Sequence, residues 1–150
     1  MPIRSRIIGV GSYVPERVLT NYDLEKMVDT SHEWILDRTG ISERRIASEE
    51  EATSDLAYLA SQIAIKDAGI KPDDLDFIIV ATVTPDMLFP STACLVQQKL
   101  GVQGIFAFDI SAACSGFIYA LSVADQYIKS GIYRAGLVVG ADVFSKVVDW

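Results

Sequence analysis

The chain has few of the residues that build disulfide frameworks or metal centres. Its 150 residues include two cysteines, Cys94 and Cys114, and a single histidine, His32. The cysteines form no C-x-x-C pair and have no zinc-ligand spacing. We therefore expect reduced thiols and no bound metal.

Long apolar runs and an excess of positive charge are also missing. No stretch approaches the ~18 continuous apolar residues needed to cross a bilayer, and the first residues lack the apolar region of a signal peptide. Thirteen Lys and Arg against twenty Asp and Glu give a net charge of −7, which disfavours nucleic acid and anionic membranes as partners. These absences predict a soluble cytoplasmic protein.

Apolar residues are abundant and alternate between strand-like and helical patterns. Half of the residues are hydrophobic, enough for one domain with a substantial core over residues 1–150. Five segments are predicted as strands: Arg6–Val14, Arg44–Ile46, Phe77–Val83, Ile105–Phe108 and Arg134–Val143. Because helical patterns separate most of them, the chain is predicted to have an α/β fold with a mostly parallel five-stranded sheet.

The helical segments have recognisable first and last residues. Asn21 is predicted to cap a short helix over Tyr22–Val28, and Ser31 to cap a second helix that ends at Gly40. Together the two helices are predicted to form an excursion from the sheet. A longer helix begins at Thr53 or Ser54 and ends at Gly69, and another covers Thr92–Leu100.

Cys114 lies where a predicted strand turns into a predicted helix. Small residues surround it, and the helix that follows has apolar residues at helical spacing. The expected buried face consists of Phe117, Leu121, Ala124 and Ile128. At a first helical turn, free backbone N–H groups and the helix dipole favour a thiolate and can stabilise an oxyanion. Position alone leaves two interpretations, a nucleophile or a buried packing residue.

The sequence around Cys114, DISAACSGFIYALSVADQYIKSG, resembles the nucleophile segment of the thiolase superfamily. Within that superfamily it is most similar to the β-ketoacyl-acyl-carrier-protein synthase III enzymes. Further blocks match in the family's order: IIGVGSYVPE, TNYDLEKMVDTSHEWILDRTGI, FIIVATVTPDMLFPSTACLVQQKLG and LVVGADV. The resemblance implies the N-terminal, nucleophile half of a five-layered α-β-α-β-α thiolase-like fold, with a catalytic histidine and asparagine in an absent C-terminal half.

The resemblance also implies an activity. Family members start bacterial type II fatty-acid synthesis by a decarboxylating Claisen condensation of a short acyl-coenzyme A with malonyl-acyl carrier protein. The primer is usually acetyl-coenzyme A, and Cys114 would carry the acyl group. Coenzyme A is then a substrate rather than a cofactor, no cofactor is expected, and the protein is expected to be a homodimer.

Four further site residues follow from the resemblance. Thr30, Trp34 and Arg38 match residues that contact coenzyme A, with Trp34 and Arg38 on either side of the adenine ring. Phe89 matches a residue that crosses the dimer interface into the partner's acyl pocket. The residues alone also fit a core aromatic at Trp34 and a loop anchor at Phe89. His32 is assigned no catalytic role.

Three alternatives remain open. Another acyltransferase of the superfamily, such as a thiolase or a plant-type polyketide synthase, would keep the nucleophile and differ in later catalytic residues. A non-catalytic half-fold that serves as an interaction domain would not be acylated. A redox protein would form a Cys94–Cys114 disulfide.

Overall fold

The computed structural model describes residues 3–149. The chain divides into two compact units. The first contains the residues up to Tyr13 together with Ala52–Asp142, and the second contains Val14–Glu51 and the residues from Val143 onward. Each unit is described by itself below.

A parallel three-stranded sheet forms the centre of the first unit. Its strands are β3 (Phe77–Ala81), β4 (Phe106–Ile110) and β5 (Gly136–Gly140), in the order β4-β3-β5. Every residue of β3 is buried, as its unbroken apolar run predicts. Ala81 lies opposite both Ile110 and Gly140, so the three strands reach their carboxyl ends at the same edge.

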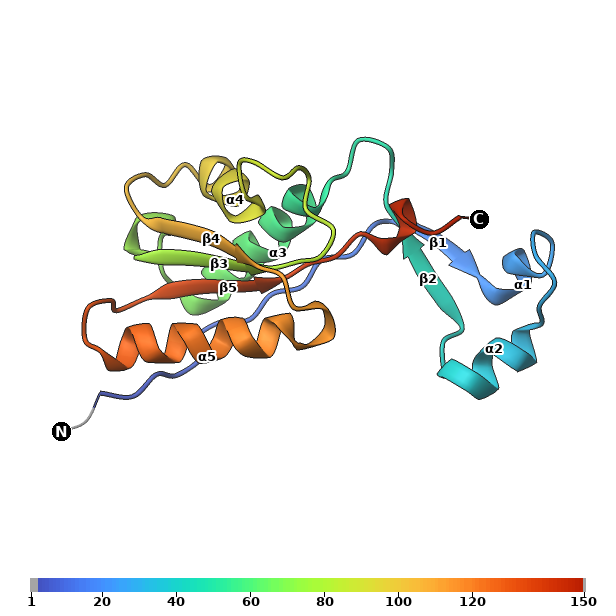
Figure 1. Ribbon diagram of the computed structural model, residues 1–150, viewed down its shortest axis with the longest axis horizontal. Helices are drawn as coiled ribbons and strands as arrows, with labels where there is room; N and C mark the ends of the chain where they lie inside the picture. The colour runs from blue at the N-terminus through green and yellow to red at the C-terminus, as the bar shows by residue number, and fades with distance from the viewer. Residues whose placement is uncertain (1–2, 150) are drawn as a thin grey trace. The chain divides into compact units, whose positions relative to one another are not determined.

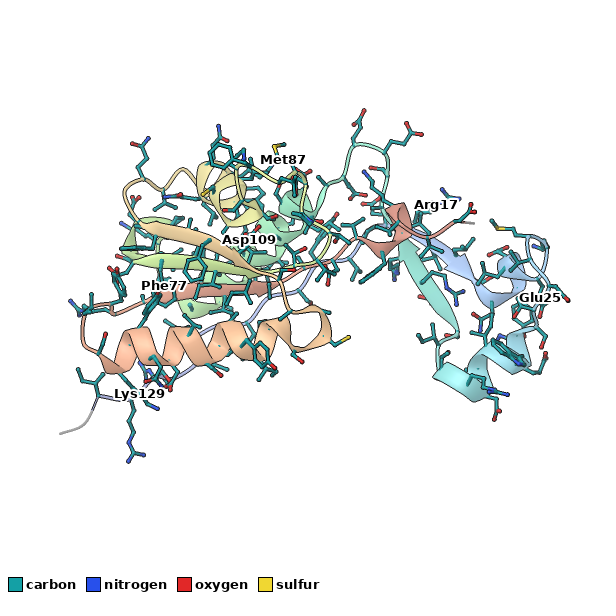
Figure 2. All side chains as sticks on the ribbon, in the orientation of Figure 1. Arg17, Glu25, Phe77, Met87, Asp109 and Lys129 are labelled. Atoms are coloured by element: carbon teal, nitrogen blue, oxygen red, sulfur yellow. The ribbon has the colours of Figure 1, made fainter. Side chains whose placement is uncertain are left out.

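Helices cover both faces of this sheet (Figure 1). They are α3 (Thr53–Ala68) and α4 (Thr92–Leu100) on one face, and α5 (Gly116–Lys129) on the other. Because side chains alternate along a strand, Ile78 and Val80 pack in the core that contains α3 and α4, whereas Phe77 and Ile79 pack in the core that contains α5. Figure 2 labels Phe77 between the sheet and α5. The predicted α/β class and the parallel pairing are confirmed.

The prediction of one five-stranded sheet is wrong. Arg6–Val14 is not a strand, and the main sheet contains only β4, β3 and β5 over the described residues. The segment instead lies against α3, where a Cβ atom on Gly9 or Gly11 would overlap the backbone of Ala64 or Ala60. The two glycines do mark a close backbone approach, but to a helix.

The buried face of α5 largely follows the prediction. Ala124 and Ile128 pack against the sheet as expected, together with Ala120, Val123 and Tyr127. Phe117 lies beside Gly140 of β5, although 42% of its surface is exposed.

The second unit contains a two-stranded antiparallel sheet and two short helices. Its elements are β1 (Arg17–Thr20), α1 (Asn21–Leu24), α2 (His32–Thr39) and β2 (Glu43–Ile46). The predicted short strand at Arg44–Ile46 is confirmed, but β2 pairs with β1 rather than with the main sheet. The two predicted helices of the excursion both occur here.

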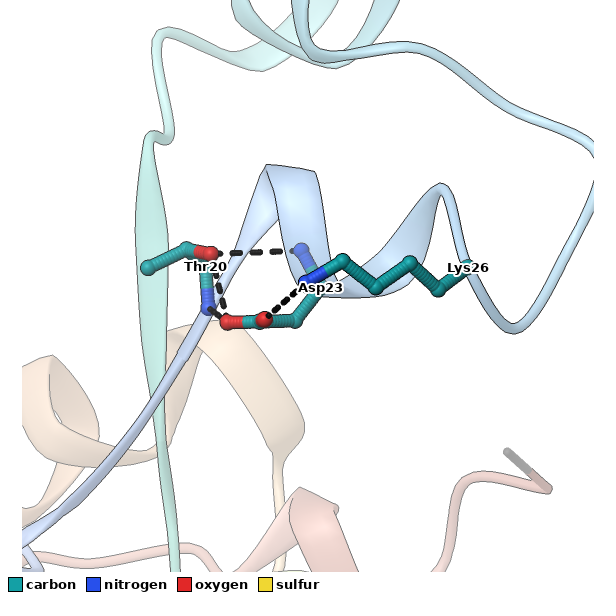
Figure 3. A network of polar contacts seen from close by, with 3 residues as sticks. All are labelled: Thr20, Asp23 and Lys26. Carbon is teal, nitrogen blue, oxygen red and sulfur yellow. Dashed lines mark hydrogen bonds and ion pairs between the residues drawn. The ribbon is translucent and has the colours of Figure 1, made fainter.

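The cap of α1 is Thr20 rather than Asn21. The Thr20 hydroxyl accepts a hydrogen bond from the Asp23 amide, and the Asp23 carboxylate accepts one from the Thr20 amide (Figure 3). Asn21 is completely buried. Ser31 caps α2 as predicted, because its hydroxyl accepts from the Trp34 amide, and Gly40 ends that helix in the left-handed conformation.

The structure also contains short 3₁₀ turns and glycines that end helices. The turns are η1 (Pro72–Asp74), η2 (Ala113–Ser115) and η3 (Phe144–Lys146). Gly69 and Gly101 end α3 and α4 with positive φ angles, as predicted.

Candidate active site at the carboxyl edge of the sheet

Cys114 lies at the carboxyl edge of the parallel sheet. β4 ends at Ile110, the η2 turn contains Cys114, and α5 begins directly afterwards at Gly116. The predicted succession of strand, tight turn and helix is confirmed. The cysteine is exposed, at the edge where ligands collect in open α/β sheets.

The backbone around Cys114 is strained and closely packed. Ala113 has a φ of 45° and is the only non-glycine residue with positive φ among residues 3–149. Such a conformation costs about 1–3 kcal/mol and is concentrated at functional sites. A Cβ atom on Gly116 would lie 3.2 Å from the Cβ of Ala81. The start of α5 therefore rests against the end of β3, which holds the turn in place.

A carboxylate joins the loops that follow β3 and β5. Asp142 Oδ1 accepts hydrogen bonds from the Thr82 hydroxyl at 3.1 Å, the Val83 amide at 2.8 Å and the Thr84 hydroxyl at 3.1 Å. Because these partners lie about 60 residues away along the chain, this contact fixes two loops beside the edge that carries Cys114.

The middle of the loop after β3 is attached to the start of α3. The Asp86 carboxylate accepts from the Ser54 amide at 2.8 Å and the Ser54 hydroxyl at 2.6 Å. The Thr53 hydroxyl donates to the Thr84 carbonyl. Sequence patterns predicted Thr53 or Ser54 as a helix cap, but both hydroxyls anchor this loop instead.

The end of the same loop is attached to β4. The Asp109 carboxylate accepts from the Thr92 amide at 2.7 Å and the Ala93 amide at 2.8 Å, at the first turn of α4 (Figure 2). Sequence reasoning missed the anchoring roles of Asp86, Asp109 and Asp142. The available signal was a group of Thr and Asp residues directly after a buried apolar strand.

The tip of this loop is apolar and exposed. Met87, Leu88 and Phe89 are 48%, 99% and 88% exposed, and Figure 2 labels Met87 on the loop. Phe89 therefore does not anchor the loop within its unit. Its side chain is available to an additional surface.

Cys94 lies in a different setting from Cys114. It is partly buried in α4, and its Sγ donates to the Ala107 carbonyl of β4 at 3.6 Å. Both cysteines are free. Among residues 3–149, no group of three or more His, Cys, Asp or Glu side chains is arranged to hold a metal ion.

The structure brings Trp34 and Arg38 together on α2. The Arg38 guanidinium carbon lies 5.4 Å from the centroid of the Trp34 ring, and the indole is 57% exposed. A flat base between the two groups needs two contacts of about 3.5 Å, or about 7 Å in total, so Arg38 would have to move outward. Thr30 is half-buried just before the helix. These residues belong to the second unit, and Cys114 belongs to the first.

Comparisons with known proteins show one consistent similarity. The model of 3-oxoacyl-[acyl-carrier-protein] synthase III matches residues 108–150, which include Cys114. The β-ketoacyl-[acyl-carrier-protein] synthase III of Caldanaerobacter subterraneus is 62% identical over 148 residues, which are 99% of this chain and 45% of that protein. Over 99% of its length the chain is similar to part of the β-ketoacyl-[acyl-carrier-protein] synthase III proteins. It spans about half the length of the curated relatives it matches.

Solved synthase III structures show the same similarity. The 3-oxoacyl-[acyl-carrier-protein] synthase III of Aquifex aeolicus has a TM-score of 0.93 and 59% identity, over 97% of this chain and 47% of that one. The priming β-ketosynthase of the R1128 polyketide pathway also has a TM-score of 0.93. It is 38% identical, over 99% of this chain and 45% of that one. The predicted thiolase-like fold is confirmed. Over residues 3–149, no helix is long and apolar enough to cross a membrane.

Proposed function

We propose that this chain supplies the nucleophile of an acyltransferase that condenses a short acyl-coenzyme A with malonyl-acyl carrier protein. The observation that carries the proposal is the exposed Cys114 on a strained turn before α5, within the segment that matches the family model. Small neighbours leave space for a thioester carbonyl, and N–H groups at the start of a helix can stabilise a developing oxyanion.

The first half-reaction transfers the primer to the enzyme. The Cys114 sulfur attacks the carbonyl carbon of acetyl-coenzyme A, a new C–S bond forms, and the bond to the coenzyme A sulfur breaks. Coenzyme A leaves as a thiol with the proton that Cys114 gave up. In the second half-reaction malonyl-acyl carrier protein loses carbon dioxide, its carbanion attacks the acetyl carbonyl, and Cys114 is released as 3-oxoacyl-acyl carrier protein forms.

The second half-reaction requires groups that stabilise an enolate-like intermediate. The family resemblance assigns these roles to a histidine and an asparagine. His32, the only histidine of this chain, lies in the second unit and contacts Asn21 and Tyr22. We therefore assign both roles to residues in the part of the relatives that this chain does not match.

Two other surfaces complete the proposal. Thr30, Trp34 and Arg38 bind the coenzyme A nucleotide, because an indole and a guanidinium both stack on a base and arginine adds charge for phosphates. The exposed apolar tip at Phe89 contacts the second subunit of a homodimer, where it borders the acyl pocket. Its 88% exposure within its own unit supports this role.

Labelling of the full-length protein tests the proposal. After incubation with radiolabelled acetyl-coenzyme A, we expect one acetyl group per chain, located on the Cys114 peptide by mass spectrometry. Cys114→Ala should lose the label, and Cys94→Ala should keep it. Label at another residue, or none in the wild type, would refute the assignment of the nucleophile.

Polyketide priming is a second candidate function, because the R1128 priming β-ketosynthase shares the backbone fold over 99% of this chain. Both functions use the same nucleophile. Condensation assays with fatty-acid and polyketide acyl carrier proteins distinguish them. A preference for the fatty-acid carrier and acetyl-coenzyme A supports the first function.

A further inference from the structure

A buried amide in the second unit connects α1 to the start of β2. Asn21 is completely buried, and its backbone amide donates to the Ser42 carbonyl at 3.0 Å. Arg44 Nη2 donates to Asn21 Oδ1 at 2.7 Å, and Asn21 Nδ2 donates to the Ile41 carbonyl at 2.8 Å. Because arginine only donates and a carbonyl only accepts, these partners determine the orientation of the Asn21 amide.

The same amide reaches the first residue of α2. Asn21 Nδ2 lies 3.3 Å from His32 Nδ1. Since Nδ2 can only donate, Nδ1 must accept, and the hydrogen of the neutral imidazole is on Nε2. His32 Nδ1 therefore accepts a hydrogen bond from the Asn21 side-chain amide, whose orientation is fixed by Arg44 and the Ile41 carbonyl.

Two more contacts hold His32. Its ring stacks on Tyr22, with centroids 4.5 Å apart and planes 10° from parallel. Its backbone amide donates to Glu25 Oε1 at 2.6 Å. The start of α2 thus has three contacts with α1 and with Glu25, the residue that follows α1.

The rest of α2 has little to orient it. No residue of this helix is buried, and Trp34 and Leu36 are 57% and 42% exposed. Apolar packing within the unit therefore contributes little to the direction of the helix axis. The contacts of His32 therefore act as local restraints on the helix that carries Trp34 and Arg38.

We propose that Asn21, Tyr22 and His32 are positioning residues that hold α2 so that Trp34 and Arg38 can bind an adenine nucleotide. The three residues do not touch the nucleotide and take no part in the chemistry at Cys114. The proposal rests on the proposed function only in assigning nucleotide binding to α2. It gives a role to the sole histidine of the chain.

Substitutions at His32 separate its two side-chain contacts. In the full-length protein, His32→Phe keeps a ring to stack on Tyr22 but removes the Nδ1 acceptor. His32→Asn keeps an acceptor near the Nδ1 position but removes the ring. Tyr58→Phe, in α3 of the first unit, is the control. Each variant is assayed for the kcat and KM of acetyl-coenzyme A, for acylation by acetyl-pantetheine, which lacks the nucleotide, and for binding of adenosine 3′,5′-bisphosphate by calorimetry.

We expect His32→Phe and His32→Asn each to raise the KM for acetyl-coenzyme A and the Kd for adenosine 3′,5′-bisphosphate by about fivefold, the effect of one lost net contact. The kcat should not change, because Cys114 is untouched. Acylation by acetyl-pantetheine should equal that of the wild type. Tyr58→Phe should match the wild type in every assay.

Other outcomes overturn the proposal. Unchanged KM and Kd values in both His32 variants would show that the contacts do not position α2. Equal losses with acetyl-coenzyme A and acetyl-pantetheine would show general damage to the fold. A wild type that binds the bisphosphate but is acylated by neither thioester would refute the proposed function alone, because weaker nucleotide binding by the variants would still support the positioning role.

Discussion

Cys114 and Cys94 differ in access and in hydrogen bonding. Cys114 is exposed on its turn, whereas Cys94 is partly buried and its Sγ donates to the Ala107 carbonyl. We therefore expect iodoacetamide to modify Cys114 much faster than Cys94 in the native full-length protein. Peptide mass spectrometry over a time course measures both rates, and denatured protein is the control in which they converge. Equal rates in the native protein would contradict the assignment of Cys114 as the accessible nucleophile.

Asp23 provides a prediction about pH. Hydrogen bonds from the Thr20 hydroxyl and amide, and then from Lys26, lower the pKa of this carboxyl from 3.8 to about 2 (Figure 3). A folded-state pKa below the unfolded value stabilises the fold above about pH 4, and this contribution disappears as the pH falls through about 2. The stability difference between wild type and Asp23→Asn should therefore narrow between pH 4 and pH 2.

Substitution of the capping threonine checks the cause of that shift. Thr20→Val removes the hydroxyl, the largest contribution, so the pKa of Asp23 should move back toward 3.8. Thr20→Ser keeps the hydroxyl and should leave the pKa low. NMR titration of the carboxyl carbon measures both variants. An unchanged midpoint in Thr20→Val would show that another group lowers the pKa.

At the scale of elements, Asp109 attaches β4 to the first turn of α4. Its carboxylate accepts from the Thr92 and Ala93 amides, where the positive end of the helix dipole adds to the attraction. Asp109→Asn keeps one acceptor and loses the charge, so we expect the free energy of unfolding to fall by about 1.5–3 kcal/mol. Urea denaturation of the full-length protein measures this change.

A matched control separates this contact from a general charge effect. Asp73→Asn makes the same chemical change at an exposed position in η1, and it should change the free energy of unfolding by less than about 0.5 kcal/mol. Equal effects of the two substitutions would indicate that the Asp109 hydrogen bonds contribute little.

At the scale of the whole molecule, the outer side of α5 should govern association. Ile118 and Tyr119 are 59% and 55% exposed. If residues 1–150 are produced alone, we expect poor solubility or self-association, because a large exposed apolar patch favours contact between copies. Size-exclusion chromatography with light scattering measures the molar mass.

Substitutions on α5 provide the comparison. Ile118→Lys should shift the 150-residue product toward the monomer, whereas Gln126→Lys, at an exposed polar position of the same helix, should leave the distribution unchanged. A soluble monomer that unfolds cooperatively without any substitution would contradict this prediction.

Local patterns in the sequence determined much of the architecture. The apolar run of β3, the helix Thr92–Leu100, and the stops at Gly69 and Gly101 were predicted and are found. The turn that carries Cys114 was also predicted, because a strand, small residues and a periodic helix follow one another within one short segment. Each of these features depends on residues a few positions apart, where propensity and periodicity are informative.

Tertiary structure decided the features that join distant segments. Arg6–Val14 has a strand-like sequence but lies on α3, where Gly9 and Gly11 approach the helix backbone closely. The Thr53 hydroxyl binds the loop after β3, although its position also suits a helix cap. His32 became a candidate positioning residue only when folding placed Asn21 and Tyr22 beside it. A single sequence does not show which strand edges are occupied or which distant donor meets which acceptor, because both depend on the packed arrangement of the whole unit.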